Sequence, residues 1–130
     1  MNRVARSLVL VASLMLFVLV PATHAVNHIP KKVNMRNTLF SKQALTIKEN
    51  QRVQWVNKDA FEHRPVSCAM VDGTVCNNEG AEFDAGIIAA AGSSASFQFN
   101  AANGRPPGVY AYHCSIHPGM VGVIIVNPAN

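Results

Sequence analysis

The sequence predicts an all-β protein, an antiparallel β-sandwich, on three observations. Short segments from Val33 onward alternate apolar and polar residues with a period of two. Clusters of Gly, Pro, Asn and Ser separate these segments at short intervals, which is typical of a sandwich with seven or so strands. Apart from a short stretch at 87–91, no segment has the 3.6-residue period of an amphipathic helix.

The alternation is clearest in two runs, 44–48 and 52–56, and a further alternating strand is predicted at 94–99. Pro65 lacks a backbone N–H, so the strand beside it lies at a sheet edge or ends there. The residues of the first two runs that we expect to point into the core are Leu45, Ile47, Val53 and either Trp55 or its neighbour Val56.

The N-terminal segment, residues 1–25, has the parts of a secretory signal peptide. Two arginines precede an apolar run at 8–20, and a small-residue cleavage site ends at Ala25. The run is short for a bilayer span. We therefore expect export, to the periplasm or an equivalent compartment, and a single domain at 26–130; an uncleaved membrane anchor is the alternative. Cleavage would leave Val26-Asn27-His28 at the terminus, where a third-position histidine can bind a separate Cu(II) ion through nitrogen atoms.

Charge excludes one class of function. The chain has 11 basic and 7 acidic residues, for a net charge of +4. Two basic residues leave with the signal, so the mature domain has nine against seven, or +2. The basic residues are scattered, with few aromatics beside them, so nucleic acid binding is not expected. Electrostatic steering toward an acidic protein partner remains open.

The three cysteines divide into a pair and a single residue. Cys68 and Cys76 bracket a turn, and in an exported protein we expect them to form a disulfide. Closing so short a loop contributes roughly 2–3 kcal/mol in the chain-entropy model. The alternatives are two free thiols, or a second metal site with Met70, which no histidine nearby in the sequence completes.

The single cysteine belongs to the most informative motif, Cys114-x-x-His117-x-x-Met120, on a tight loop between two predicted strands. A thiolate, an imidazole and a thioether suit copper, and a second histidine would complete a blue-copper ligand set. The thioether argues against structural zinc, which takes Cys, His and carboxylate ligands. The alternative is a hairpin in which the three residues are coincidental.

Four histidines follow the signal segment, and one of them is the best candidate for the missing ligand. His113 adjoins Cys114 on a strand, so the two side chains point to opposite faces. His28 lies near the new terminus. His63 ends a strand that runs into a turn-rich loop, where a rigid scaffold can aim it toward His117.

With these motifs in order, the chain resembles the cupredoxins, small blue copper proteins of the plastocyanin and amicyanin type, over about residues 40–126. The resemblance implies a Greek-key sandwich, one type 1 copper ion and electron transfer with no enzyme activity. The short ligand loop looks like that of amicyanin, whereas the segment between the paired cysteines is not part of the pattern. The ligands that the resemblance implies are His63, Cys114, His117 and Met120.

The resemblance also implies roles for neighbouring residues. Asn57 would tie the two ligand loops together, unless it only ends its strand, and Asp59 would fold its loop locally. Arg64 would donate its backbone N–H to the cysteine sulfur. An arginine here departs from the Asn or small residue expected of the family, and because a guanidinium close to copper favours Cu(I), we expect a raised reduction potential. Electrons would leave through His117 in an apolar patch, or through His113, for which a solvated strand histidine is the alternative.

The leading hypothesis is therefore an exported electron carrier, a monomer that docks transiently with redox partner proteins and has no membrane span once the signal is removed. The second is a copper-binding protein that stores, delivers or buffers the metal. An enzyme is the least expected, because four ligands fill the site and no Ser-His-Asp set or carboxylate pair is evident. A sandwich without metal is the remaining alternative.

Overall fold

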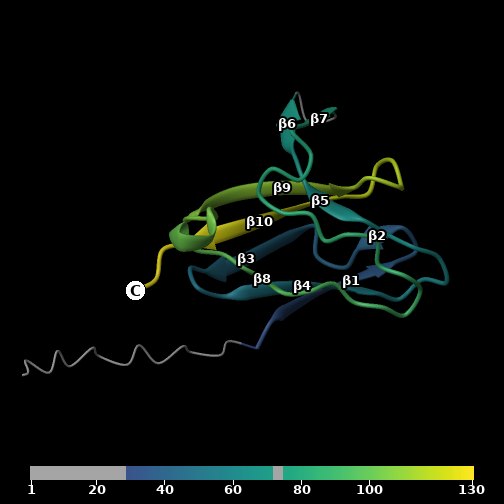
Figure 1. Ribbon diagram of the computed structural model, residues 1–130, viewed down its shortest axis with the longest axis horizontal. Helices are drawn as coiled ribbons and strands as arrows, with labels where there is room; N and C mark the ends of the chain where they lie inside the picture. The colour runs from purple at the N-terminus through teal and green to yellow at the C-terminus, as the bar shows by residue number, and fades with distance from the viewer. Residues whose placement is uncertain (1–28, 72–74) are drawn as a thin grey trace, which may run out of the picture.

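The computed structural model describes residues 29–71 and 75–130. Its strands form two four-stranded sheets that pack face to face, with a separate two-stranded hairpin at one edge (Figure 1). The described part of the chain contains no α-helix, only a single 3-10 turn at Ala101–Asn103. None of its helical segments has the length and apolar character needed to cross a bilayer. The predicted all-β sandwich is confirmed.

The first sheet has the strand order β2-β1-β4-β8. These strands are β1 (Lys31–Arg36), β2 (Leu39–Phe40), β4 (Arg52–Asn57) and β8 (Phe97–Gln98). The strand predicted at 94–99 is shorter than expected: only β8 pairs continuously, while Ser93 forms an isolated bridge to Val56.

The second sheet has the order β3-β10-β9-β5 and carries three of the four predicted ligands at one end. Pro65 begins β5, which is an edge strand, as the missing N–H predicted. The strands are β3 (Ala44–Lys48), β5 (Pro65–Ser67), β9 (Gly108–Cys114) and β10 (Val121–Asn127).

The sandwich is not purely antiparallel, which corrects the sequence-based expectation. Strand β1 pairs in parallel with β4, with Val33 opposite Trp55, and β10 pairs in parallel with β3, with Ile124 opposite Leu45. After β1 the chain runs antiparallel to it in β2 and then crosses to β3 in the other sheet. It re-enters the first sheet as β4, which runs in the same direction as β1. A period of two predicts a strand but not the direction of its neighbour.

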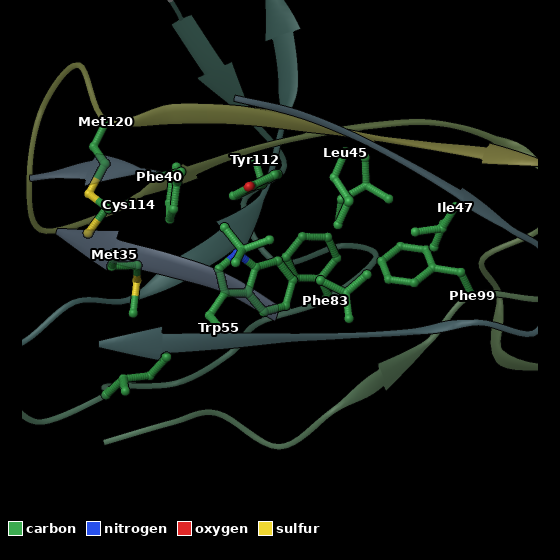
Figure 2. Packing of buried hydrophobic residues seen from close by; sticks show 14 of the residues in the cluster. Met35, Phe40, Leu45, Ile47, Trp55, Phe83, Phe99, Tyr112, Cys114 and Met120 are labelled. Carbon is green, nitrogen blue, oxygen red and sulfur yellow. The ribbon is translucent and has the colours of Figure 1, made fainter. Parts of the chain in front are cut away.

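The core lies between the two sheets around Trp55, whose exposure is 0% (Figure 2). Its ring packs at centroid distances of 4.9 Å from Phe83 and 5.4 Å from Tyr112. The predicted inward positions of β3 and β4 are confirmed, and Trp55 rather than Val56 is the buried residue of its pair. The stretch at 87–91 forms no helix.

One glycine in β10 leaves room for an aromatic ring of β9. Gly122 is directly opposite Tyr112, and a Cβ added to Gly122 would lie 2.5 Å from a ring carbon of the buried tyrosine. The absence of a side chain therefore lets the aromatic ring cover the neighbouring backbone.

The hairpin of β6 (Ala69–Val71) and β7 (Val75–Asn77) projects from the sandwich beside β5 and β9 (Figure 1). Cys68 immediately precedes β6, and Cys76 lies within β7. The two form a disulfide, which confirms the predicted pairing.

Candidate metal centre

Three of the predicted ligands lie on the connection between β9 and β10. Cys114 is the last residue of β9, and Met120 immediately precedes β10. The turn between them closes through backbone hydrogen bonds from Met120 N–H to the His117 carbonyl (3.3 Å) and from Cys114 N–H to the Met120 carbonyl (2.9 Å). Gly119 has a φ of 82°, a left-handed conformation that glycine adopts without strain.

The fourth ligand comes from the connection between β4 and β5. His63 is fully buried, and its backbone exchanges two hydrogen bonds with Ile88 (2.7 and 3.1 Å). These two hydrogen bonds hold the His63 loop against a segment that is distant in sequence. The orientation of the imidazole therefore depends on the packing of the sandwich as well as on its own loop.

The three strongest donor atoms converge on one point. Nδ1 of His63 lies 3.1 Å from Nδ1 of His117, and Sγ of Cys114 lies 3.7 and 3.5 Å from these two nitrogens. A point equidistant from the corners of this triangle lies about 2.0 Å from each, which is close to metal–nitrogen and metal–sulfur bond lengths. Converging lone pairs at this spacing fit a bound cation.

Met120 places its thioether next to this triangle. The residue is 1% exposed, and Figure 2 shows its side chain meeting that of Cys114 at one end of the core. A thiolate, two imidazoles and a thioether make the ligand set that suits copper in both of its common oxidation states. The clustered residues therefore fit a type 1 copper ion.

Comparison with known proteins agrees with this chemistry. A family model described as copper binding proteins, plastocyanin/azurin family, matches residues 27–127. The chain belongs to the plastocyanin/azurin family. The copper cofactor expected from the sequence is thereby confirmed by the family match together with the clustered ligands.

Solved structures of amicyanin share the fold of this plastocyanin/azurin family member. A reduced Cu(I) form of one amicyanin variant is 22% identical, with a TM-score of 0.59 over 79% of this chain and 89% of that chain. An oxidised form of a second variant is also 22% identical, with a TM-score of 0.56 over 74% and 80% of the two chains. The resemblance to cupredoxins is confirmed at the level of fold and family.

In this cupredoxin the backbone of one residue links the two ligand loops. Arg64 donates its N–H to Sγ of Cys114 (3.4 Å), and its carbonyl accepts a hydrogen bond from the N–H of Ser115 (3.0 Å). Arg64 lies next to His63, so a single peptide segment positions one ligand and contacts the sulfur of another. A backbone N–H that donates to a ligand sulfur helps to orient that ligand.

Asn57 plays a different part from the one that the resemblance implied. The amide is fully buried, and its Nδ2 donates to the carbonyls of Phe61, Ile88 and Ala89, while its Oδ1 accepts from the N–H of Asp59. In the described structure these bonds tie the His63 loop to residues 88–89, not to the Cys114–Met120 loop. Because the acceptors are backbone carbonyls, no sequence motif could have predicted these contacts.

Asp59 supports His63 directly, a role that the sequence analysis missed. Its carboxylate lies 2.9 Å from Nε2 of His63 and accepts backbone hydrogen bonds from Asn37 (2.7 Å) and Thr38 (3.2 Å). Burial raises the pKa of Asp59, but these hydrogen bonds and the nearby imidazole outweigh it, and the net pKa is lowered. The only feature of the sequence that pointed to this contact is the position of the aspartate, four residues before the histidine on a loop.

The Arg64 guanidinium does not act as an isolated charge. Its Nη2 lies 2.5 Å from the carboxylate of Asp84, and both side chains are partly exposed. The guanidinium lowers the pKa of Asp84, and the carboxylate raises that of Arg64. Because the carboxylate offsets the guanidinium charge, the pair adds little net charge beside the ligands, and the raised reduction potential expected from Arg64 stays a prediction.

The remaining predicted residues lie outside the donor triangle. His113 lies within β9, on the opposite face from Cys114, and is within ion-pair distance of Glu79, so it is not a simply solvated strand histidine. His28 and the signal segment lie outside the described residues.

Proposed function

We propose that this cupredoxin is a non-enzymatic electron carrier, in which one copper ion held by His63, Cys114, His117 and Met120 alternates between Cu(II) and Cu(I). The observation that carries the proposal is the donor triangle. Its atoms stand within 3.1–3.7 Å of one another on two backbone segments that hydrogen bonds already fix. A site whose ligands are held in place needs little rearrangement when the charge of the metal changes.

The surface above the site suits transient docking. The ring of Phe61 lies 5.2 Å from that of His117 and 5.3 Å from that of His63, and it is 45% exposed. Ile116, next to His117, is 38% exposed. The imidazole of His117 is thus flanked by two partly exposed apolar side chains. A redox partner protein that docks on them can exclude water from the imidazole. We propose His117 as the exit for electrons, with the protein acting as a monomer, and His113 as a second, through-bond route.

The test is the visible spectrum of the purified protein loaded with Cu(II). An intense thiolate-to-copper band that ascorbate bleaches and oxidation restores is expected. Cys114→Ser should abolish the band, whereas Ser115→Ala, which keeps the backbone N–H bonded to Arg64, should preserve it. A pale sample that binds copper without this band would contradict the proposal.

Redox cycling separates a carrier from a storage, delivery or buffering protein. A carrier is expected to keep its copper through many cycles in the presence of a moderate chelator. Stoichiometric release of Cu(I) to the chelator on the first reduction would instead favour delivery. We also propose export, on the basis of the predicted signal at residues 1–25. Mass spectrometry of the secreted protein is expected to give Val26 as the first residue.

A further inference from the structure

A second group of metal-ligand side chains lies on the outer face of the same strand that carries Cys114. The candidate ligand atoms of Cys68, Cys76 and His113 all lie within 4.8 Å of one another. No histidine lies near the paired cysteines in the sequence to complete a metal site there. The fold supplies one, from a residue almost forty positions further along the chain.

The pairing of β5 with β9 explains this meeting. Val66 is opposite His113, and the N–H of Cys68 donates to the carbonyl of Ala111 (3.0 Å). Side chains two residues apart on a strand share a face, so Cys68 lies on the same face as His113 and opposite that of Cys114. Cys68 is 4% exposed, and Cys76 and His113 are partly buried, so the group is partly sheltered from solvent.

A carboxylate completes the group. Nε2 of His113 is buried and lies 2.5 Å from a carboxylate oxygen of Glu79, yet among the described residues it has no partner with hydrogen-bond geometry. A carboxylate against an imidazole is the usual arrangement that orients a metal-binding histidine. Two sulfurs and one imidazole also match a known zinc ligand set, with water in the fourth position.

We propose that Cys68, Cys76 and His113, oriented by Glu79, form a second metal site that accepts Zn²⁺ when the disulfide is reduced. The disulfide and the zinc-bound form are then two alternative states of one pair of cysteines. This inference does not rest on electron transfer by the copper site.

The chemistry balances with a dithiol as the reductant. Attack of its thiolate on the Cys68–Cys76 bond forms a mixed disulfide with one cysteine and releases the other. The second thiol of the reductant then displaces the remaining cysteine, and the reductant becomes a cyclic disulfide. Two electrons and two protons pass to the protein. Binding of Zn²⁺ then displaces the two thiol protons to solvent, because zinc binds cysteine as thiolate.

The test uses the copper-loaded protein. It is reduced anaerobically with a water-soluble phosphine, which becomes its oxide with oxygen from water, so that copper stays in its site as Cu(I). Zn²⁺ is then added, excess ions are removed by gel filtration, and zinc and copper per chain are measured by mass spectrometry. We expect one zinc and one copper per reduced chain, and no zinc in the disulfide form.

Two variants that keep the disulfide test the ligands individually. His113→Asn should abolish zinc retention, and Glu79→Gln should lower zinc affinity by roughly 10–100-fold in a competition with a chromophoric chelator. Glu82→Gln, an exposed carboxylate on the same connection, is the matched control and should leave zinc affinity unchanged.

Three outcomes would overturn the proposal: zinc retained equally by the disulfide form, zinc affinity unchanged in His113→Asn, or no zinc in reduced protein that keeps its fold. Unfolding on reduction, seen by circular dichroism, would overturn it too, because the fold assembles the ligands. The blue band after reoxidation reports the copper site separately, so failure here is distinct from failure of the electron-transfer proposal.

Discussion

The carboxylate of Asp59 lies 2.9 Å from Nε2 of His63, while the other ring nitrogen of that histidine faces Cys114. The imidazole is therefore held from behind by a carboxylate that two further backbone N–H groups fix in turn. Partners of this kind set the orientation and basicity of a metal-binding histidine.

Asp59→Asn should lower copper affinity by about 10–100-fold, because the amide keeps the shape of the carboxylate but loses its charge. Competition with a copper chelator measures the effect. Asp84→Asn, which removes a more exposed carboxylate near the same loop, is the control and should change affinity far less. Equal losses in the two variants would show that His63 does not depend on Asp59.

Acid should destabilise the protein through Asp59. Its pKa in the folded state is lowered, despite burial, by hydrogen bonds from Asn37, Thr38 and His63. The stabilisation is therefore present above the unfolded-state pKa of about 3.9 and is lost as the pH falls through the lower folded-state value. The free energy of unfolding of the apoprotein, measured with urea between pH 6 and 3, should fall more steeply in the wild type than in Asp59→Asn. Parallel curves would contradict this assignment.

The pair of Arg64 and Asp84 should matter for potential only when it is broken. Arg64→Gln leaves an unbalanced carboxylate and should lower the reduction potential, whereas Asp84→Asn leaves an unbalanced guanidinium and should raise it. The double variant should return close to the wild-type potential in protein-film voltammetry. Each single change should alter the free energy of unfolding only slightly, because the pair is partly exposed. Shifts of the same sign in both single variants would rule out compensation.

Gly122→Ala should destabilise the sandwich by roughly 1–3 kcal/mol, because the new Cβ would lie 2.5 Å from the fully buried ring of Tyr112. Chemical denaturation of the apoprotein measures this. Gly108→Ala on the same pair of strands is the control, since its nearest non-neighbouring atom would lie 3.8 Å away and the change should be small. If Gly108→Ala lost as much unfolding free energy as Gly122→Ala, the cause would be strand propensity and not a clash with Tyr112.

The sequence was sufficient for the ligands because each has distinctive chemistry and few competitors. Cys114, His117 and Met120 share one loop, and elimination among four histidines left His63. The core positions of β3 and β4 were also predictable, since a strand with one buried face must alternate. Local patterns of this kind require no knowledge of the rest of the fold.

Contacts between distant segments were not predictable in the same way. Asp59 reaches Asn37 and Thr38 across more than twenty residues, and Glu79 meets His113 only because β5 pairs with β9. Carboxylates are common on loops, so spacing alone does not distinguish those that support a ligand. Parallel pairing of β3 with β10 likewise depends on the path of the chain between the sheets.

The position of the copper-ligand loop has one more consequence. Residues 115–120 connect two strands that are paired along nearly their whole length, and β10 is also held on its other side by β3. The loop can therefore gain or lose residues, or be replaced by a loop of another sequence, while the sheet below it keeps its register. Changes in the sequence or length of this loop can therefore alter the surroundings of the metal while the strand pairing of the sandwich stays the same.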